Sequence, residues 1–417
     1  MKLKKIAVVG LGYIGLPTSI VLASNEQSVY GYDINEDHLK KILSGEYETK
    51  EPGLNEKLQS VLKNKQLEVG SQLPSADVFI ICVPTPIDLN NENPVPDLSY
   101  VKKAFFEISK VIKKGDLIIL ESTSPVGTTR QMSEYLETLT TGLTFPHNNK
   151  NADVNISYCP ERVIPGNIIF ELIHNDRVIG GLTESCAQNS MEIYKLFIKS
   201  NCYLTNAQTA ELVKLVENSY RDVNIAFANE LSMLCPDFDI DHTELIKLSN
   251  LHPRVNILSP GAGVGGHCIA VDPWFIVSNN PKKTKLIKTA RIVNDLKPKF
   301  IFEDIKKYIT KISKKAEDDI AISCFGLAYK PNVDDLRESP ALEIYELLKK
   351  NHKGKVLAIE PNISNAEIKN KFNIIEQNEG IEIADLAVIL VAHEEFRNMQ
   401  LGPSTIVLDY SGMGHGT

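Results

Sequence analysis

A single cysteine, Cys268, stands just after a glycine-rich run from Pro260 to Gly266, with Asp272 four residues further on. A lone cysteine is ordinarily an inert buried residue. Here, however, glycines would let a substrate approach the backbone, their N–H groups could polarise an oxygen, and a thiolate beside them could attack a carbonyl. A dehydrogenase that stops at an aldehyde needs no such thiol. The segment therefore favours an oxidation that continues from an alcohol to an acid.

Three further polar residues could carry charge or protons in the same reaction. Lys214 and Asn218 lie four residues apart in a segment with helical periodicity, so their side chains point the same way. Their stripe includes apolar positions, which indicates an interior where an ammonium could stabilise an oxyanion. Glu161 follows an apolar run, and open α/β sheets hold ligands at the carboxyl ends of their strands. Alternatively, Lys214 is an ordinary surface lysine, and Glu161 is a solvated acid at the end of a strand.

Gly10, Gly12 and Gly15 fit the pattern GxGxxG, which is a weak signal by itself. Here it follows a short apolar run, opens a helical pattern and is followed, 18 residues past Gly15, by Asp33 at the end of a second apolar run. A pyrophosphate would lie at the helix N-terminus, and the Asp33 carboxylate would bind the ribose hydroxyls and repel a 2′-phosphate. The context predicts NAD rather than NADP; a glycine turn without a ligand is the alternative.

The elements that must position these residues follow an alternating order. Short apolar runs predict strands at 5–10, 28–33, 78–83, 117–121 and 156–159, and helical patterns lie between them, as at 14–24 and 100–112. Buried parallel strands that alternate with helices predict a doubly wound sheet over about the first 200 residues.

The rest of the chain divides into a helical part and a second sheet. Helical spacing predicts one long helix over about 207–234 that connects two lobes, and further helices at 243–250 and 286–296, interrupted by the loop at 260–268. Strands at 320–326, 356–360 and 386–391 echo the first region. Because Gly326 is not followed by the glycine triplet, the second lobe is expected to bind something other than a dinucleotide.

We therefore expect an α/β fold with two Rossmann-like, doubly wound parallel sheets joined by a long helix and a helical dimerisation region. The expected domains are an NAD-binding Rossmann domain at 1–204, a central helical domain with the cysteine loop at 205–300, and a second Rossmann-like domain at 301–417.

Composition excludes several classes of function. The 417 residues carry a formal charge of −8, so no broad basic surface is available to nucleic acid or an anionic membrane. No apolar run approaches the roughly 18 residues that span a bilayer. The basic start before residues 6–16 has the look of a secretory signal, but three glycines interrupt it and no cleavage site follows. Seven scattered cysteines without a CxxC pair predict reduced thiols, a cytoplasmic protein and no metal centre.

Seven motifs, in order along essentially the whole chain, resemble the UDP-glucose/GDP-mannose dehydrogenase family. They are GLGYIGLP at 10–17, VPTP at 83–86, ESTSPVGTT at 121–129, YCPER at 158–162, ELVKLVENSYRDVNIAFANE at 211–230, GVGGHCIAVDP at 263–273 and GLAYKPNVDDLRESPA at 326–341.

The resemblance implies a two-step, four-electron oxidation of the C6 alcohol of a nucleotide sugar, with two NAD used in turn, for bacterial surface polysaccharide precursors. Cys268 would capture the C6 aldehyde as a thiohemiacetal, which is oxidised to a thioester that water hydrolyses. Asp272, and Glu161 through a water, would handle protons, while Lys214 and Asn218 would hold charge on the C6 oxygen.

The resemblance also implies binding residues. Those for the cofactor are Gly10, Gly12, Tyr13, Ile14, Gly15, Asp33, Pro84, Thr85, Thr123 and Arg337, with Thr123 near the nicotinamide and the catalytic water. Those for the substrate are Glu161, Arg162, Lys214, Asn218, Arg254, Gly265 and Lys330. Arg254 matches an arginine that reaches the substrate of the neighbouring subunit, which implies a homodimer.

Four segments, at 145–166, 175–181, 252–258 and 267–275, most resemble members that act on UDP-N-acetyl amino sugars and favour UDP-N-acetyl-D-mannosamine. UDP-N-acetyl-D-glucosamine is the alternative substrate, because family members that use it share the pairs His267-Cys268 and Asp272-Pro273. A catalytically idle sensor of NAD or nucleotide sugar is a third interpretation, although Cys268, Lys214 and Asp272 are all present. One departure from the family is Glu360-Pro361, where an Asp-Pro is common, and it leaves C-terminal contacts undefined.

Overall fold

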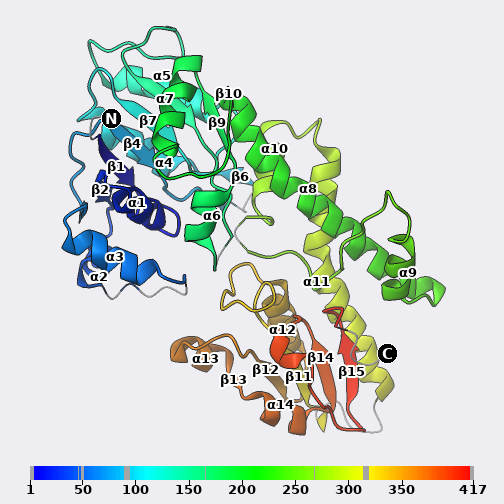
Figure 1. Cartoon of the computed structure of the whole chain (residues 1–417). Helices are drawn as coiled ribbons and strands as arrows, with labels where there is room; N and C mark the ends of the chain where they lie inside the picture. Colours follow the sequence, from blue (N-terminus) through cyan, green and yellow to red (C-terminus); the bar gives the residue numbers. More distant parts are fainter. Residues whose placement is uncertain are drawn as a thin grey trace. The chain divides into compact units, whose positions relative to one another are not determined.

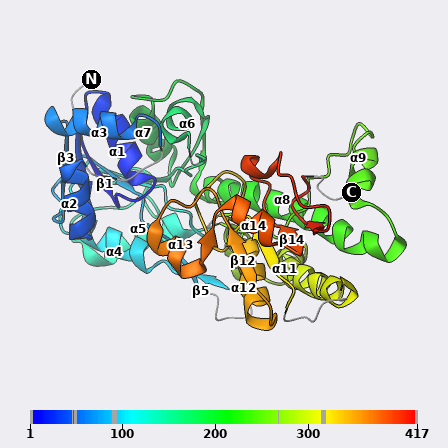
Figure 2. The same ribbon diagram turned by 90° about the horizontal axis from the view of Figure 1, so that it is seen from below.

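The computed structural model describes residues 4–45, 47, 51–88, 94–164, 166–266, 268–312 and 319–413. The chain divides into a first unit, residues 1–216 and 274–279, and a second unit, residues 217–273 and 280–417. The boundary falls within one long helix, α8 (Ala207–Leu234), whose bounds agree with the sequence prediction. Each unit has its own sheet (Figures 1 and 2). Each also has its own cluster of buried hydrophobic residues.

The described residues of the first unit form an eight-stranded sheet in the order β10-β9-β8-β7-β4-β1-β2-β3. The strands are β1 (Lys5–Val9), β2 (Ser28–Tyr32), β3 (Leu67–Gly70), β4 (Val78–Ile81), β7 (Leu117–Leu120), β8 (Asn155–Tyr158), β9 (Arg177–Gly181) and β10 (Cys202–Asn206), and a separate antiparallel pair is formed by β5 (Ile87–Asp88) and β6 (Val95–Pro96). From β3 to β8 the order is that of a Rossmann sheet, and it reverses between β1 and β4.

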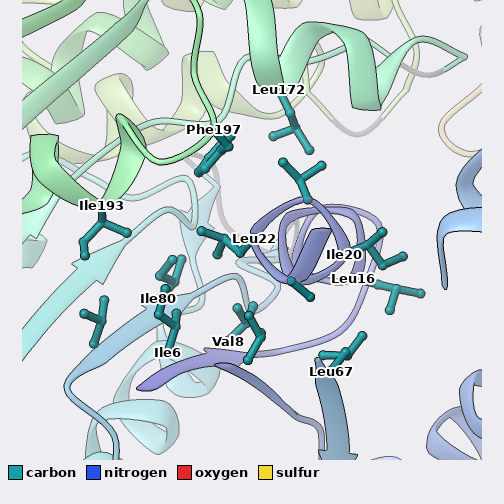
Figure 3. Packing of buried hydrophobic residues seen from close by; sticks show 14 of the residues in the cluster. Ile6, Val8, Leu16, Ile20, Leu22, Leu67, Ile80, Leu172, Ile193 and Phe197 are labelled. Atoms are coloured by element: carbon teal, nitrogen blue, oxygen red, sulfur yellow. The ribbon is translucent and has the colours of Figure 1, made fainter. Parts of the chain in front are cut away.

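Helices cover both faces of this sheet. They are α1 (Gly15–Ser24), α2 (Glu36–Ser44), α3 (Leu54–Lys63), α4 (Ser99–Ser109), α5 (Thr128–Leu139), α6 (Ile168–His174) and α7 (Glu184–Tyr194). The unit also includes the start of α8 and most of α10 (Asp272–Asn279). Alternate strand residues serve opposite cores: Ile6 and Val8 pack with α1, α3, α6 and α7, whereas Ala7 and Val9 pack with α4 and α5. Figure 3 shows α1 above β1 in the first of these cores.

Two strands, β9 and β10, run against the parallel direction expected of this sheet. β9 pairs antiparallel to β8, with Ser157 opposite Gly181 and Tyr158 opposite Gly180, so the sheet is mixed and not wholly parallel. Hydrophobic periodicity reveals a strand but not its direction. Because β9 runs back along β8, its first residue lies at the carboxyl end of β8, and continuing the register places Arg177 opposite Glu161.

The described residues of the second unit form a five-stranded parallel sheet in the order β13-β12-β11-β14-β15, as expected for a second Rossmann-like lobe. The strands are β11 (Ile322–Phe325), β12 (Val356–Ile359), β13 (Ile374–Ile375), β14 (Leu386–Ile389) and β15 (Ile406–Asp409). The helices are the rest of α8, η1 (Cys235–Phe238), α9 (His242–Ser249), α11 (Lys285–Ile312), α12 (Pro340–Asn351), α13 (Ala366–Phe372), α14 (Gln377–Ile383) and η3 (Glu394–Phe396).

Helix α11 is longer than the predicted helix at 286–296, and it continues past residue 300, where the sequence suggested a domain boundary. Proline inside a helix removes a hydrogen bond and usually ends the helix, yet Pro298 lies within α11. Ile301, Ile305 and Ile309 recur every four residues beyond it and are buried against the second sheet, so packing favours continued helix. Within the described ranges, no helix is long and apolar enough to cross a membrane.

Candidate active site

The turn after β1 leaves room for a ligand at its middle glycine. Gly10 has a φ of +92°, and a Cβ there would press on the Cys82 carbonyl oxygen, while a Cβ at Gly15 would collide with the Gly10 carbonyl oxygen. A Cβ at Gly12 would meet nothing within 4 Å. The outer glycines are therefore required by the turn itself, whereas Gly12 faces open space at the start of α1, where a pyrophosphate would fit.

Asp33 lies at the end of β2 beside this turn. Its Oδ2 accepts a hydrogen bond from the Leu11 N–H at 2.8 Å, and its Oδ1 accepts one from the Asn35 N–H at 2.9 Å. His38 Nε2 contacts the Leu11 carbonyl oxygen at 2.8 Å, so both polar groups of Leu11 are held. Each Asp33 oxygen retains a lone pair, which suits two ribose hydroxyls. Asp33 thus has a loop-holding role that sequence reasoning missed.

Tyr13 and Ile14 complete the turn at the start of α1. Tyr13 is exposed, and its hydroxyl donates to Glu51 Oε1 at 3.1 Å. Glu51 also accepts from the N–H groups of Gly166 and Ile168, at 2.5 and 3.0 Å, and so joins the turn to the start of α6.

Two loops at the same edge of the sheet hold the other expected cofactor residues. Pro84 and Thr85 follow β4, and Thr123 follows β7, while Ser122 Oγ donates to the Val83 carbonyl at 2.7 Å and ties the two loops together. The second loop is also clamped from α8. The buried Glu211 carboxylate accepts from the N–H groups of Gly127 and Thr129, at 2.6 and 2.8 Å, and from the Thr129 hydroxyl at 2.6 Å.

Glu161, directly after β8, is the centre of a buried group in the first unit. Its Oε2 accepts from Arg177 Nη1 at 2.8 Å and its Oε1 from the Arg162 N–H at 2.6 Å. Lys214 Nζ donates to the Glu161 backbone carbonyl at 2.7 Å. The expected residues Glu161, Arg162 and Lys214 are therefore brought together, while the Arg162 guanidinium donates to the Asp176 carbonyl. Arg177 was missed, because only the antiparallel register places it here.

A second buried carboxyl lies near the Arg177–Glu161 pair. Glu121 accepts from the Tyr194 hydroxyl at 2.6 Å and from the Cys82 thiol at 3.2 Å. Burial raises the pKa of Glu121, with the charge of Arg177 opposing and that of Glu161 adding to the shift. Burial also raises the pKa of the neighbouring Cys159 thiol to about 12, so Cys159 is no nucleophile.

The second unit groups three other expected residues. Cys268 is partly exposed, and its carbonyl accepts from the Asp272 N–H at 2.8 Å in the turn that begins α10. Asn218 Nδ2 donates to Asp272 Oδ2 at 2.6 Å, and both side chains are buried. A partly exposed thiol beside an oriented carboxylate and amide can do covalent chemistry and proton transfer. His267 of the same motif lies outside the described residues.

The cysteine loop lies against the segment that follows β11. The Gly266 N–H donates to the Arg337 carbonyl at 3.1 Å, Gly266 packs against the Tyr329 ring, and a Cβ at Gly265 would collide with the Glu338 carbonyl. Lys330 is half-buried beside Tyr329, and Arg337 is exposed and paired with Asp335 at 2.6 Å. The loop that contains Gly265 therefore packs against the segment that contains Lys330 and Arg337.

Glu360 occupies the position in the second sheet that Asp33 has in the first. Its Oε2 accepts from the N–H groups of Leu327 and Ala328, at 2.7 and 2.9 Å, and pairs with His393 Nε2 at 3.0 Å. Burial alone would raise the pKa of Glu360, but the His393 contact and the backbone N–H groups lower it below its usual value. The Glu360 carboxylate therefore occupies the backbone N–H groups of Leu327 and Ala328, which a dinucleotide phosphate would otherwise need as donors.

Arg254 is the remaining expected residue of the second unit. It is exposed in the turn after α9, where its N–H donates to His252 Nδ1 at 3.3 Å.

Three family models match successive parts of the chain. They are the "UDP-glucose/GDP-mannose dehydrogenase family, NAD binding domain" at residues 4–198, the central domain of the same family at 208–296, and its UDP binding domain at 323–413. The three models together cover most of the sequence.

Individual proteins are similar over nearly the full length. A UDP-N-acetyl-D-mannosamine dehydrogenase of Campylobacter jejuni is 50% identical over 401 residues, which is 95% of this chain and 97% of that protein. An NDP-N-acetyl-D-galactosaminuronic acid dehydrogenase of Ralstonia nicotianae is 45% identical over 98% of this chain and 96% of that protein. The structure of UDP-D-ManNAc dehydrogenase from Pyrococcus horikoshii has a TM-score of 0.87, with 38% identity, over 98% of this chain and 96% of that chain.

Proposed function

Because the chain belongs to the UDP-glucose/GDP-mannose dehydrogenase family, and is thus an NAD-dependent oxidoreductase, we propose that it oxidises the C6 alcohol of UDP-N-acetyl-D-mannosamine to the uronate. The observation that carries the sugar assignment is the 50% identity, over 95% of the chain, to an enzyme of that name. UDP-N-acetyl-D-glucosamine remains the second candidate, since the motifs around Cys268 are compatible with it. The product would supply bacterial surface polysaccharide synthesis.

The assignment is tested by incubating the protein with NAD and one UDP-sugar at a time. The three UDP-sugars are those of N-acetylmannosamine, N-acetylglucosamine and N-acetylgalactosamine. We expect NADH from the mannosamine sugar at a far higher kcat/KM, with two NADH per uronate, because an alcohol loses four electrons on the way to an acid. Galactosamine is included because a relative at 45% identity is named for that series. Preference for another sugar would overturn the sugar assignment. A steady one NADH per sugar would overturn the acid-forming route, and no NADH would favour a sensor.

Cys268 is the proposed nucleophile. The alcohol first loses a hydride to NAD and its hydroxyl proton to a base, which gives the aldehyde. The Cys268 thiolate then adds to the aldehyde carbon, and the oxygen takes up a proton to give a thiohemiacetal. Loss of that proton to a base and of a second hydride, which a second NAD would accept, gives the thioester. Water displaces the thiolate and leaves the carboxylate. NAD supplies only the hydride acceptor, so the protein must supply nucleophile, bases and oxyanion stabilisation.

The other proposed catalytic residues have complementary roles in this scheme. Asp272, oriented by Asn218, accepts or returns protons. Glu161, oriented by Arg177, holds the attacking water, with Thr123 beside it. The ammonium of Lys214, together with the Asn218 amide, stabilises the negative charge on the C6 oxygen.

The remaining expected residues bind the two ligands. The start of α1 at Gly12 would hold the NAD pyrophosphate and Asp33 would hold the ribose, and the other residues proposed to bind the cofactor are Gly10, Tyr13, Ile14, Gly15, Pro84, Thr85 and Arg337. Lys330, Gly265 and Arg162 contact the nucleotide sugar, whose UDP part belongs to the lobe of the second sheet. None of the seven cysteines forms a disulfide, which agrees with a cytoplasmic location, where thiols stay reduced.

Replacing Asp33 by Asn should shift cofactor preference. The variant keeps an oxygen that can accept from Leu11 but loses the charge that binds ribose hydroxyls and repels a 2′-phosphate. Charged hydrogen bonds contribute about 1.5–3 kcal/mol, so the Kd for NAD should rise roughly ten- to a hundred-fold while NADP is little affected. Asp37→Asn, on the exposed start of α2, is the control. An unchanged ratio of NAD to NADP affinity would remove Asp33 from the ribose site.

The outward face of α8 supports a homodimer. Tyr220, Phe227 and Leu234 recur every seven residues, so they share one side of the helix, and they are 69%, 54% and 47% exposed. An apolar stripe of this kind on a long helix suits packing against its copy around a two-fold axis. The proposed dimer brings Arg254 of one subunit to the substrate of the other.

A further inference from the structure

The inward face of the same helix is polar. Asn218, Asp222 and Asn229 are spaced by four and seven residues, so they lie on one side of α8, opposite Tyr220 and Phe227. They are 8%, 0% and 0% exposed. Burying amides and a carboxylate costs free energy unless each is hydrogen-bonded, and an apolar stripe would pack at lower cost. The partners of these three side chains therefore explain why they are polar.

Two of the three side chains are linked through α11. Asp222 pairs with Arg291, the largest fully buried side chain among the described residues, and its Oδ1 also accepts from Asn294 Nδ2 at 2.8 Å. Asn294 Oδ1 in turn accepts from Asn229 Nδ2 at 2.9 Å. The result is one buried polar chain, Asn229–Asn294–Asp222–Arg291, that fixes α8 against α11.

This polar chain reaches both ends of the cysteine loop. Asn229 Oδ1 accepts from the Gly261 N–H at 3.0 Å, at the start of the loop, and Arg291 Nη1 approaches the Ile269 carbonyl at 3.5 Å, at its end. Between these points the glycines provide little stiffness of their own. We propose that Asn229 and Arg291 are positioning residues that hold the loop so that the Cys268 thiol is aimed at the substrate carbon.

The inference rests on the proposed role of Cys268 as nucleophile, and it predicts a specific combination of changes. In Asn229→Ala the loop loses its first anchor and opens more often, so iodoacetamide should alkylate Cys268 at least about threefold faster in the absence of ligands. A misaimed thiol should at the same time lower kcat about ten- to a hundred-fold. Affinity for NAD should change little, because the glycine turn and Asp33 belong to the other unit and the Arg337 side chain is held by Asp335 and not by the loop.

The experiment measures alkylation of Cys268 by peptide mass spectrometry, kcat, and the Kd for NAD, all well below the melting temperature. Asn224→Ala is the matched control, because Asn224 is on α8 and its side chain donates to the Tyr220 carbonyl of its own helix. Arg291→Lys, which keeps a cation beside Asp222, should have the same effects and carries the test if Asn229→Ala does not fold. Alkylation that is unchanged or slower in the folded variants would overturn the inference. Failure of the proposed function would instead appear as acid formation by a protein without Cys268.

Discussion

Cys268→Ser should lose acid formation by roughly a thousand-fold or more while it still binds NAD and the UDP-sugar. A serine hydroxyl is almost wholly protonated near neutral pH and does not form the adduct that a thiolate forms with an aldehyde. In the proposed scheme, the first oxidation needs no covalent bond to this residue. The variant should therefore make a first NADH and retain or release the aldehyde.

The measurement is uronate yield and NADH per sugar at saturating NAD, with binding of both ligands determined separately. Cys202→Ser is the control, because Cys202 is a half-buried cysteine on β10 whose pKa is raised by burial. It should behave as the parent protein. Wild-type yields of uronate from Cys268→Ser would contradict the covalent route, whereas loss of NAD binding would indicate a structural defect.

The local parts of the fold could be predicted from the sequence. β1, α1 and β2 begin and end within about a residue of expectation, because a buried parallel strand is a short apolar run and a glycine turn marks its end. Likewise α8 has the predicted bounds, because helical periodicity continues over all of it. The direction of β9 and the length of α11 depend on pairing and packing with distant segments, and local pattern carries no information on either.

The residues of the candidate site also fall into two groups, those that can be proposed from the local sequence and those that only the fold reveals. Glu161, Lys214 and Cys268 were recognisable from residue type and neighbours in the sequence. Arg177 and Asn229 were not, because an arginine after a loop or an asparagine in a helix has nothing unusual nearby in the chain. Their importance depends on what they meet in the fold: Arg177 meets Glu161 across an antiparallel pair, and Asn229 meets Gly261.

Helix α8 combines a polar inner stripe with an apolar outer one, the reverse of an ordinary surface helix. The inner stripe holds the cysteine loop, and the outer stripe is the face that we propose to pack against a second copy of the chain. A dimer built on this helix has a consequence for Arg254, which is exposed in its own chain. If it contacts the substrate of the partner, Arg254→Ala should raise the KM for the UDP-sugar about ten-fold or more and leave the KM for NAD unchanged, because a planar guanidinium fork suits phosphate and sugar oxygens.

Mixing the Arg254→Ala and Cys268→Ser proteins then gives the sharpest test of a shared site. In a heterodimer, the subunit that carries Arg254→Ala keeps its own Cys268 and receives Arg254 from its neighbour, so one of two sites is complete. With equal amounts and random exchange, half of the dimers are mixed and half of their sites work, so activity at low substrate should recover to about a quarter of the parent value. Each variant alone should stay near background, and incubation too short for exchange is the control. If confirmed mixed dimers regain no activity, Arg254 serves the same site as the cysteine of its own chain, and the outer stripe of α8 has another explanation.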